Sequence, residues 1–170
     1  MNVSEAVRTK RAIRQFTGQP VPDEAVRAIL NAGRRAQSSK NTQPWHFVVV
    51  RDREKLKQLS ECGAYAGHLA GAALAVVLLT PDPAQRWSIM FDAGQSAAYM
   101  QLAAWELGLG SCLATIYKPE KAGAILGAPA EQHVNVALSF GYPAPGQVRP
   151  DVVKKGGRRP FAEVVHWEQW

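Results

Sequence analysis

The stretch QSSKNTQPWHFVVV at residues 37–50 joins a polar loop to a run of apolar, β-prone side chains. Residues 45–50 are typical of a buried strand, because aromatic and β-branched side chains pack well on a pleated surface. Residues 37–44 are rich in amide and hydroxyl groups, which supply both hydrogen-bond donors and acceptors. We therefore expect a polar loop that can recognise a ring, presented directly in front of a core strand.

Helical and strand patterns continue on both sides of this stretch. Apolar side chains at helical spacing predict helices over residues 4–9, 23–35, 54–62, 88–107 and 119–126, with Asp23 as an N-cap and Gly108 at the end of the long helix. Apolar runs and alternation predict strands over residues 45–50, 72–79, 111–116 and 133–141. The order of the elements indicates helices around a sheet of about four strands, in an α+β or α/β arrangement.

The chain has the size of one domain, with 170 residues of which 46% are hydrophobic. Its longest apolar run, residues 69–79, is shorter than the roughly 20 residues of a membrane-spanning helix. The N-terminus has no apolar signal core, and the two cysteines show no disulfide or metal-ligand spacing. We expect a cytoplasmic protein without a membrane partner.

Positive charge gathers at the two ends of the chain. The formal net charge is +6, and the Lys and Arg residues cluster in residues 10–14 (KRAIR) and 156–160 (GGRRP). Such clusters fit a small anion such as a phosphate, and they are also common on solvated surfaces. Since no recognition helix, aromatic platform or zinc motif accompanies them, we expect no nucleic-acid partner.

The sequence offers no evident catalyst of its own. His46, His68, His133 and His166 lack cysteine or carboxylate neighbours at ligand spacing, which indicates packed or surface histidines and no metal site. The acidic residues are scattered singly, so no pair stands out for acid–base catalysis. An enzyme of this composition has to take its chemistry from a cofactor, and we assign no catalytic side chain.

In this order the motifs resemble those of the FMN-dependent nitroreductase family. The family's opening Arg-Arg-Ser-x-Arg-x-Phe is similar to KRAIRQF at 10–16, and its Pro-Ser-x-x-Asn-x-Gln-Pro-Trp is similar to QSSKNTQPW at 37–45. An Asp-x-Gly in the long helix, Leu-Gly-Leu-Gly-Ser-Cys at 107–112 and a closing segment at 158–167 also match. The chain departs from the family at Ala12, Gln37 and the Ala98-Tyr99 pair, where serine, proline and Gln-Asn are usual.

The resemblance implies an α+β fold with a central, mostly antiparallel sheet flanked by helices. It also implies a homodimer in which the C-terminal strand is exchanged between subunits. Residues 1–170 then form a single FMN-binding domain, with residues 147–170 as an arm that reaches the partner. The apolar tail supports this expectation, because aromatic side chains and strand edges need a cover.

The resemblance also implies which residues hold FMN. Lys10, Arg11 and the Ala12 backbone would bind the phosphate and ribityl chain, and Arg14 would stabilise the negative charge that reduction leaves on the pyrimidine end. The other implied contacts are Arg158 and Lys155 at the phosphate, Ser38, Ser39 and Asn41 from the partner, Leu113 along the ring, and a backbone N–H of Thr115 or Ile116 at the hydride-accepting nitrogen.

The implied reaction is a ping-pong transfer of electrons from NAD(P)H through FMN to a planar acceptor. A flat, open flavin face selects for planarity, so nitroaromatics, quinones and free flavin are the candidate acceptors. An alternative in the same superfamily is a flavin-binding protein or specialised flavin enzyme that does not use NAD(P)H as its donor.

Overall fold

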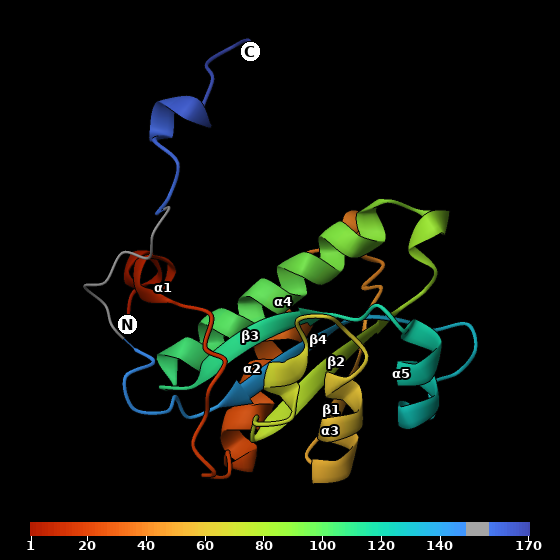
Figure 1. Cartoon of the computed structure of the whole chain (residues 1–170). Coiled ribbons are helices and arrows are strands. Elements are labelled where there is room, and N and C mark those ends of the chain that lie inside the picture. Colours follow the sequence, from red (N-terminus) through yellow and green to blue (C-terminus); the bar gives the residue numbers. More distant parts are fainter. Residues whose placement is uncertain (149–156) are drawn as a thin grey trace.

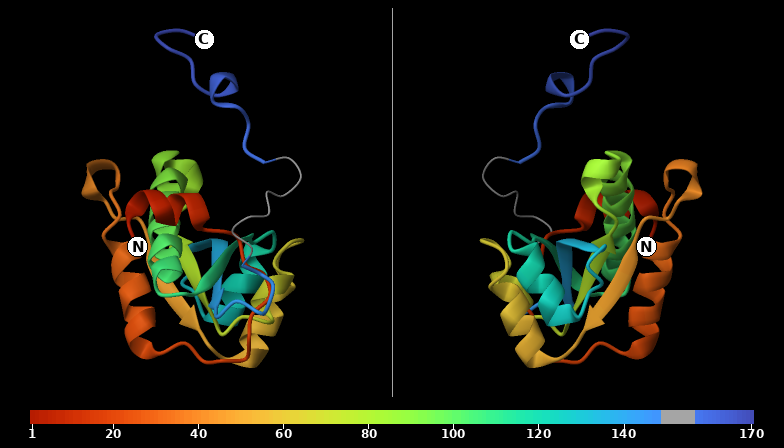
Figure 2. Two further views of the ribbon diagram at one scale, coloured as in Figure 1. Left: turned by 90° about the vertical axis from the view of Figure 1, so that its left-hand side faces the viewer. Right: turned by 90° about the vertical axis from the view of Figure 1, so that its right-hand side faces the viewer.

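The protein folds into three layers, with a sheet between two pairs of helices (Figures 1 and 2). The structure is a computed structural model that describes residues 1–148 and 157–170. Its helices are α1 (Val3–Thr9), α2 (Asp23–Arg34), α3 (Arg53–Ser60), α4 (Ser88–Glu106) and α5 (Pro119–Leu126). Its strands are β1 (His46–Val50), β2 (Leu74–Thr80), β3 (Gly110–Thr115) and β4 (His133–Gly141).

The four strands form one sheet in the order β1-β2-β4-β3, and every neighbouring pair is antiparallel. This confirms the predicted α+β class with a mostly antiparallel sheet. Every residue of β2 is buried, because both faces of this strand are covered. Val76 and Leu78 face α2 and α4, while Ala75, Val77 and Leu79 face α3 and α5.

The predicted boundaries hold to within two residues, and the N-cap of one helix differs from the prediction. The N-cap of α2 is Pro22, with no side-chain hydrogen bond, and Asp23 is already the first helical residue. The prediction of Asp23 as N-cap was therefore wrong, because the extended Pro22 already occupies that place. Gly108 follows the end of α4 with φ +74°, a left-handed conformation that glycine adopts without strain.

The long helix α4 buries one side on α2 and the sheet and leaves another side in solvent. Its buried stripe includes Ala93, Ala97 and Met100, which belong to the core between α4 and β2. Trp87 at its N-cap, Phe91 and Tyr99 are exposed by 80%, 62% and 42%. These three large aromatic side chains thus lie on the solvent side of the helix.

The described part of the C-terminal tail lies outside the layers, and it contains one 3₁₀ turn at Phe161–Glu163 and no strand (Figure 1). Trp167 and Trp170 are exposed by 77% and 100%. Of residues 157–170 all but Val165 are exposed in the described part of the chain, and the predicted strand exchange stays a prediction. Within residues 1–148 and 157–170, no helix combines the length and apolar character needed to span a bilayer.

Candidate functional site

The basic segment 10–14 docks against the outer edge of β3. The Ile13 N–H donates to the Ser111 carbonyl at 3.0 Å, and Ala12 forms a parallel bridge with Ser111. This approach requires glycine at position 110, since a Cβ there would lie 2.6 Å from the Ile13 Cβ. The fully buried Ile13 therefore anchors the segment, while the neighbouring Arg14 stays exposed.

Lys10 and Arg158, from opposite ends of the chain, come within electrostatic range of each other. Burial lowers the pKa of the Lys10 ammonium, the Cys112 thiol acts in the opposite direction, and the Arg158 guanidinium lowers this pKa again. Among the described residues, the charged groups that act on Lys10 thus include a second cation, Arg158. Such an arrangement favours the binding of an anion.

Part of the Arg11 guanidinium forms hydrogen bonds at the C-terminal end of α1. Its Nη1 donates to the carbonyls of Arg8 at 2.7 Å and Lys10 at 2.9 Å, which satisfies acceptors at the end of α1. A guanidinium has five N–H donors, so this leaves others for a ligand. Lys155, the remaining predicted cation, lies outside the described residues.

The open edge of β3 presents backbone groups beside this segment. Along an antiparallel strand the N–H groups point alternately toward and away from the paired neighbour. The Ile116 N–H donates to the Asn135 carbonyl at 2.9 Å, on the β4 side, whereas the Ser111 carbonyl accepts from Ile13 on the opposite side. The alternation therefore directs the Thr115 N–H toward the open edge and leaves the Ile116 N–H engaged with β4.

The polar loop 38–43 is held in an uncommon conformation. Lys40, Asn41 and Gln43 have φ values of 52°, 53° and 47°, which side chains other than glycine rarely adopt. Strained non-glycine residues of this kind concentrate at ligand sites. The Ser38 Oγ accepts from the Gln43 N–H at 2.9 Å, which stabilises the turn from within.

Two contacts from outside the loop fix its position. The buried Asp92 of α4 accepts from the Ser39 N–H through Oδ2 at 3.1 Å, and Arg86 Nη2 donates to Thr42 Oγ1 at 2.7 Å. Sequence patterns did not reveal these supports, because each joins residues more than forty positions apart. The Asp-x-Gly motif marked Asp92 but not its role.

The cations and the polar loop lie at opposite ends of α4 (Figure 1). Asp92 holds the loop near the N-terminus of α4, and Trp105 near its C-terminus donates to Thr9 Oγ1 at 3.0 Å, next to Lys10. A rise of 1.5 Å per residue puts Asp92 and Trp105 roughly 20 Å apart along the helix. One chain thus brings the segment with Lys10, Ala12 and Arg14 to the β3 edge, has Arg158 within electrostatic range of Lys10, and keeps Ser38, Ser39 and Asn41 apart from this segment.

An open pocket of about 520 Å³ adjoins the end of this edge. Thr115 and Ile116 line it together with polar side chains of Asp82, His133 and Asn135. Its size suits a small organic molecule, since such pockets usually measure about 300–1,000 Å³.

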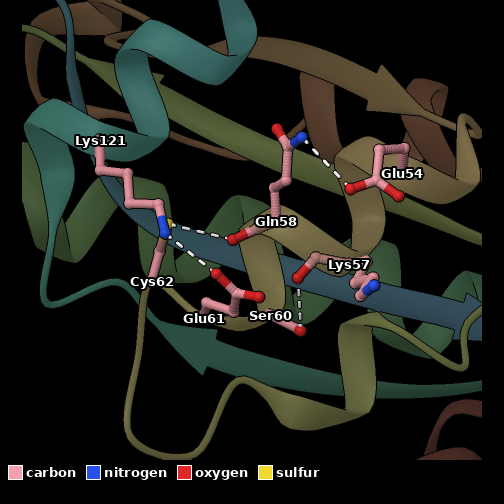
Figure 3. Close-up of polar contacts among 7 residues, drawn as sticks. All are labelled: Glu54, Lys57, Gln58, Ser60, Glu61, Cys62 and Lys121. Atoms are coloured by element: carbon pink, nitrogen blue, oxygen red, sulfur yellow. Dashed lines mark hydrogen bonds and ion pairs between the residues drawn. The ribbon is translucent and has the colours of Figure 1, made fainter.

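A cluster of polar side chains that includes Glu61, Cys62 and Lys121 joins α3 to α5 and stabilises the fold (Figure 3). Lys121 Nζ lies 3.1 Å from Glu61 Oε2, and this hydrogen bond lowers the pKa of the Glu61 carboxyl. The Cys62 Sγ donates to the Gln58 carbonyl at 3.4 Å, and burial raises the pKa of its thiol. A thiol of raised pKa is a poor nucleophile. In the described ranges no group of three or more His, Cys, Asp or Glu residues could hold a metal ion.

Comparisons with known proteins agree with this architecture. The chain matches the sequence model of the Nitroreductase family over residues 7–62 and 60–142. A protein of Archaeoglobus fulgidus assigned as an NADH dehydrogenase/NAD(P)H nitroreductase is 36% identical over 144 residues, which cover 79% of this chain and 82% of the relative. An NADPH-flavin oxidoreductase of Vibrio harveyi is 28% identical over 99% of this chain and 75% of its own length.

A solved structure extends the agreement to three dimensions. The FMN-dependent nitroreductase of Clostridium difficile R20291 superposes with a TM-score of 0.82 at 28% identity, covering 99% of this chain and 100% of that one. The family match covers most of the chain, and the fold agrees with it throughout. The chain therefore belongs to the nitroreductase family.

Proposed function

We propose that this protein is an FMN-dependent oxidoreductase that passes electrons from NAD(P)H to a planar acceptor. The observation that carries the proposal is the basic segment 10–14 docked at the outer edge of β3, with Arg158 within electrostatic range of Lys10. A dianionic phosphate placed between two such cations would bear the opposite charge to both of them. The residues present therefore fit the phosphate end of FMN.

The same edge fits the ring of FMN. The Thr115 N–H, directed away from β4, would donate to the ring nitrogen that accepts hydride, and Leu113 would lie along the ring. The exposed Arg14 would stabilise negative charge on the pyrimidine end, because a fixed cation there favours the reduced form. When bound, FMN supplies the hydride chemistry, and we assign no catalytic side chain to this protein.

The second half of the proposed site comes from another copy of the chain. Ser38, Ser39 and Asn41 sit at the far end of α4 from Lys10, so they would contact an FMN held by the partner's cations. The exposed aromatics Trp87, Phe91 and Tyr99 supply an apolar surface for such a homodimer. Residues 147–170 would then reach across as an arm.

NAD(P)H and the acceptor would use one position on the flavin in turn, which is a ping-pong mechanism. The pocket of about 520 Å³ next to Thr115 gives a place for either molecule. Nitroaromatics, quinones and free flavin are the proposed acceptors. The names of two relatives include NAD(P)H or NADPH, which supports the same electron donor for this protein. Since NAD(P)H is a cytoplasmic metabolite, we propose a cytoplasmic location.

Absorbance spectroscopy under anaerobic conditions tests this function. The purified protein should bind FMN. The absorption band of the oxidised flavin, at roughly 450 nm, should then bleach when NADH or NADPH is added, because the cofactor carries the redox chemistry. Addition of a quinone or nitroaromatic should restore the band. If FMN binds but neither nucleotide bleaches it, the NAD(P)H-dependent reaction is wrong, and the alternative flavin protein with another donor takes its place.

A further inference from the structure

His68 is a buried titratable residue that has no role in the proposed FMN site. It lies on the short turn Gly67–Leu69, is only 8% exposed and packs behind β3 and β4. Its Nδ1 lies 2.8 Å from the Oγ of the fully buried Ser139, which also donates to the Cys112 carbonyl at 3.3 Å. One ring nitrogen is thus held firmly.

The other ring nitrogen has an unusual environment. His68 Nε2 is buried and forms no hydrogen bond of good geometry among the described residues. A buried polar atom without a partner is rare and calls for a specific explanation. The Leu113 carbonyl lies close enough to favour a protonated ring, and Leu113 belongs to the edge that would carry the flavin.

The charge nearest to His68 is also part of the proposed flavin site. Burial lowers the pKa of His68, the positive charge of Arg14 lowers it further, and the Leu113 backbone raises it. The charge of Arg14 acts on the ring from the segment docked on β3, the buried Cys112 thiol belongs to β3, and β4 contributes the neutral Ser139. Within residues 1–148 and 157–170, Arg14 is therefore the ionised group that acts on His68.

We propose that His68 takes up a proton when the flavin beside Arg14 is reduced and releases it on reoxidation. This inference rests on the proposed function. Bound FMN would accept two electrons and one proton as hydride from NAD(P)H, and the negative charge gained on reduction would be stabilised by Arg14. That charge offsets the repulsion between Arg14 and an imidazolium, so a proton from solvent binds Nε2. Ser139 and Leu113 then accept from the two ring N–H groups.

His68 is in this account a positioning residue and not a catalytic one. Nε2 is covered by protein, so it touches neither hydride nor acceptor. Its proton adds positive charge behind the flavin edge only while the flavin is reduced. The effect is reciprocal, because a proton that binds the reduced form more tightly also makes reduction easier at lower pH.

NMR of the histidine rings tests the inference directly. Full-length protein labelled with ¹⁵N reports the protonation of each ring, and a His68→Gln variant identifies the His68 signals among the four histidines. In the FMN-loaded protein, anaerobic reduction with dithionite should raise the pKa of His68 by about one pH unit or more. An unchanged His68 titration in the two redox states would overturn the inference.

A second arm works without FMN. Replacing Arg14 by glutamine in the FMN-free protein should raise the pKa of His68, whereas Arg27→Gln, on an exposed position of α2, should leave it unchanged. If Arg14→Gln has no effect, the coupling on which the inference depends does not exist. Protein that stays colourless after addition of FMN overturns the proposed function as well, and bound FMN without a His68 response overturns only this inference.

Discussion

The carboxylate of Asp92, 2% exposed within α4, accepts a hydrogen bond from the backbone N–H of Ser39 at 3.1 Å. This hydrogen bond joins the first turn of the polar loop to the long helix α4. Because the loop also contains three non-glycine residues with positive φ, an external anchor is needed to hold this conformation.

Replacing Asp92 by alanine should destabilise the protein and weaken FMN binding. A hydrogen bond to a charged group contributes about 1.5–3 kcal/mol, so we expect a loss of about 2 kcal/mol in the free energy of unfolding. Urea denaturation and FMN titration measure the two effects. Asp92→Asn keeps an oxygen acceptor and should lose less. Equal stability and affinity of Asp92→Ala and the parent chain would show that the anchor has no role.

Replacing Gly110 by alanine should displace the basic segment from β3. The new Cβ would lie 2.6 Å from the Ile13 Cβ, and both positions are buried. Overpacking of this kind costs about 1–3 kcal/mol, and weaker FMN binding should accompany it because Lys10 and Arg14 flank Ile13.

Gly123→Ala in α5 is the matched control for this substitution. Its nearest neighbour would be the Ala128 Cβ at an ordinary 3.9 Å, so the same change should stabilise the helix by roughly 0.5–1 kcal/mol. Thermal unfolding measures both variants, and a Gly110→Ala protein as stable as Gly123→Ala would refute the packing argument.

Lys10→Met should weaken FMN binding while largely preserving the fold, because methionine keeps an unbranched apolar stem. Loss of one charge-assisted contact to a phosphate is expected to cost about 1.5–3 kcal/mol, or roughly 10- to 150-fold in Kd. Fluorescence titration with FMN gives the Kd. Lys57→Met, on the exposed side of α3, is the control and should bind FMN like the parent. Equal Kd values for the two variants would remove Lys10 from the phosphate site.

His68 should make stability depend on pH below neutrality. Its pKa in the folded protein is lowered from the ordinary 6.5, so between those two values the unfolded chain binds the extra proton. Stability should therefore be unaffected above pH 6.5 and fall as the pH drops from 6.5 through the lowered pKa. Urea denaturation from pH 8 to 5 measures this dependence. His68→Gln should flatten it, and an identical slope in both proteins would contradict the assignment.

Local sequence patterns predicted the helices and strands well. They did not predict which of these elements lie next to one another in space. The alternation of Val134, Val136, Leu138 and Phe140 predicted β4 with its observed bounds, but the expectation of a half-buried strand was wrong, because β4 lies inside the sheet and both of its faces are covered. The place of β4 between β2 and β3 is set by packing of both sheet faces, which no local pattern records.

The candidate site divides in the same way. Motif residues such as Lys10, Arg14 and Arg158 stand out as charges, and the fold brings the segment 10–14 to the edge of β3, with Arg158 within electrostatic range of Lys10. The supporting contacts of Asp92, Arg86 and His68 join segments far apart in sequence, so only the structure shows them. Among the two candidate amides, hydrogen bonding of Ile116 to Asn135 singles out Thr115 as the one on the open edge.

The central claim is that each FMN site takes its cations from one chain and its polar loop from another, and mixed dimers test it most directly. A chain with Lys10→Met and Arg14→Gln is paired, through two purification tags, with a chain carrying Asn41→Trp. Neither homodimer should bind FMN, whereas the mixed dimer regains one intact site and should bind one FMN. When all three substitutions are in one chain and its partner is unchanged, both sites are damaged and no FMN should bind. The opposite pattern, with no FMN in the first mixed dimer and one in the second, would place the whole site in a single chain and contradict the account.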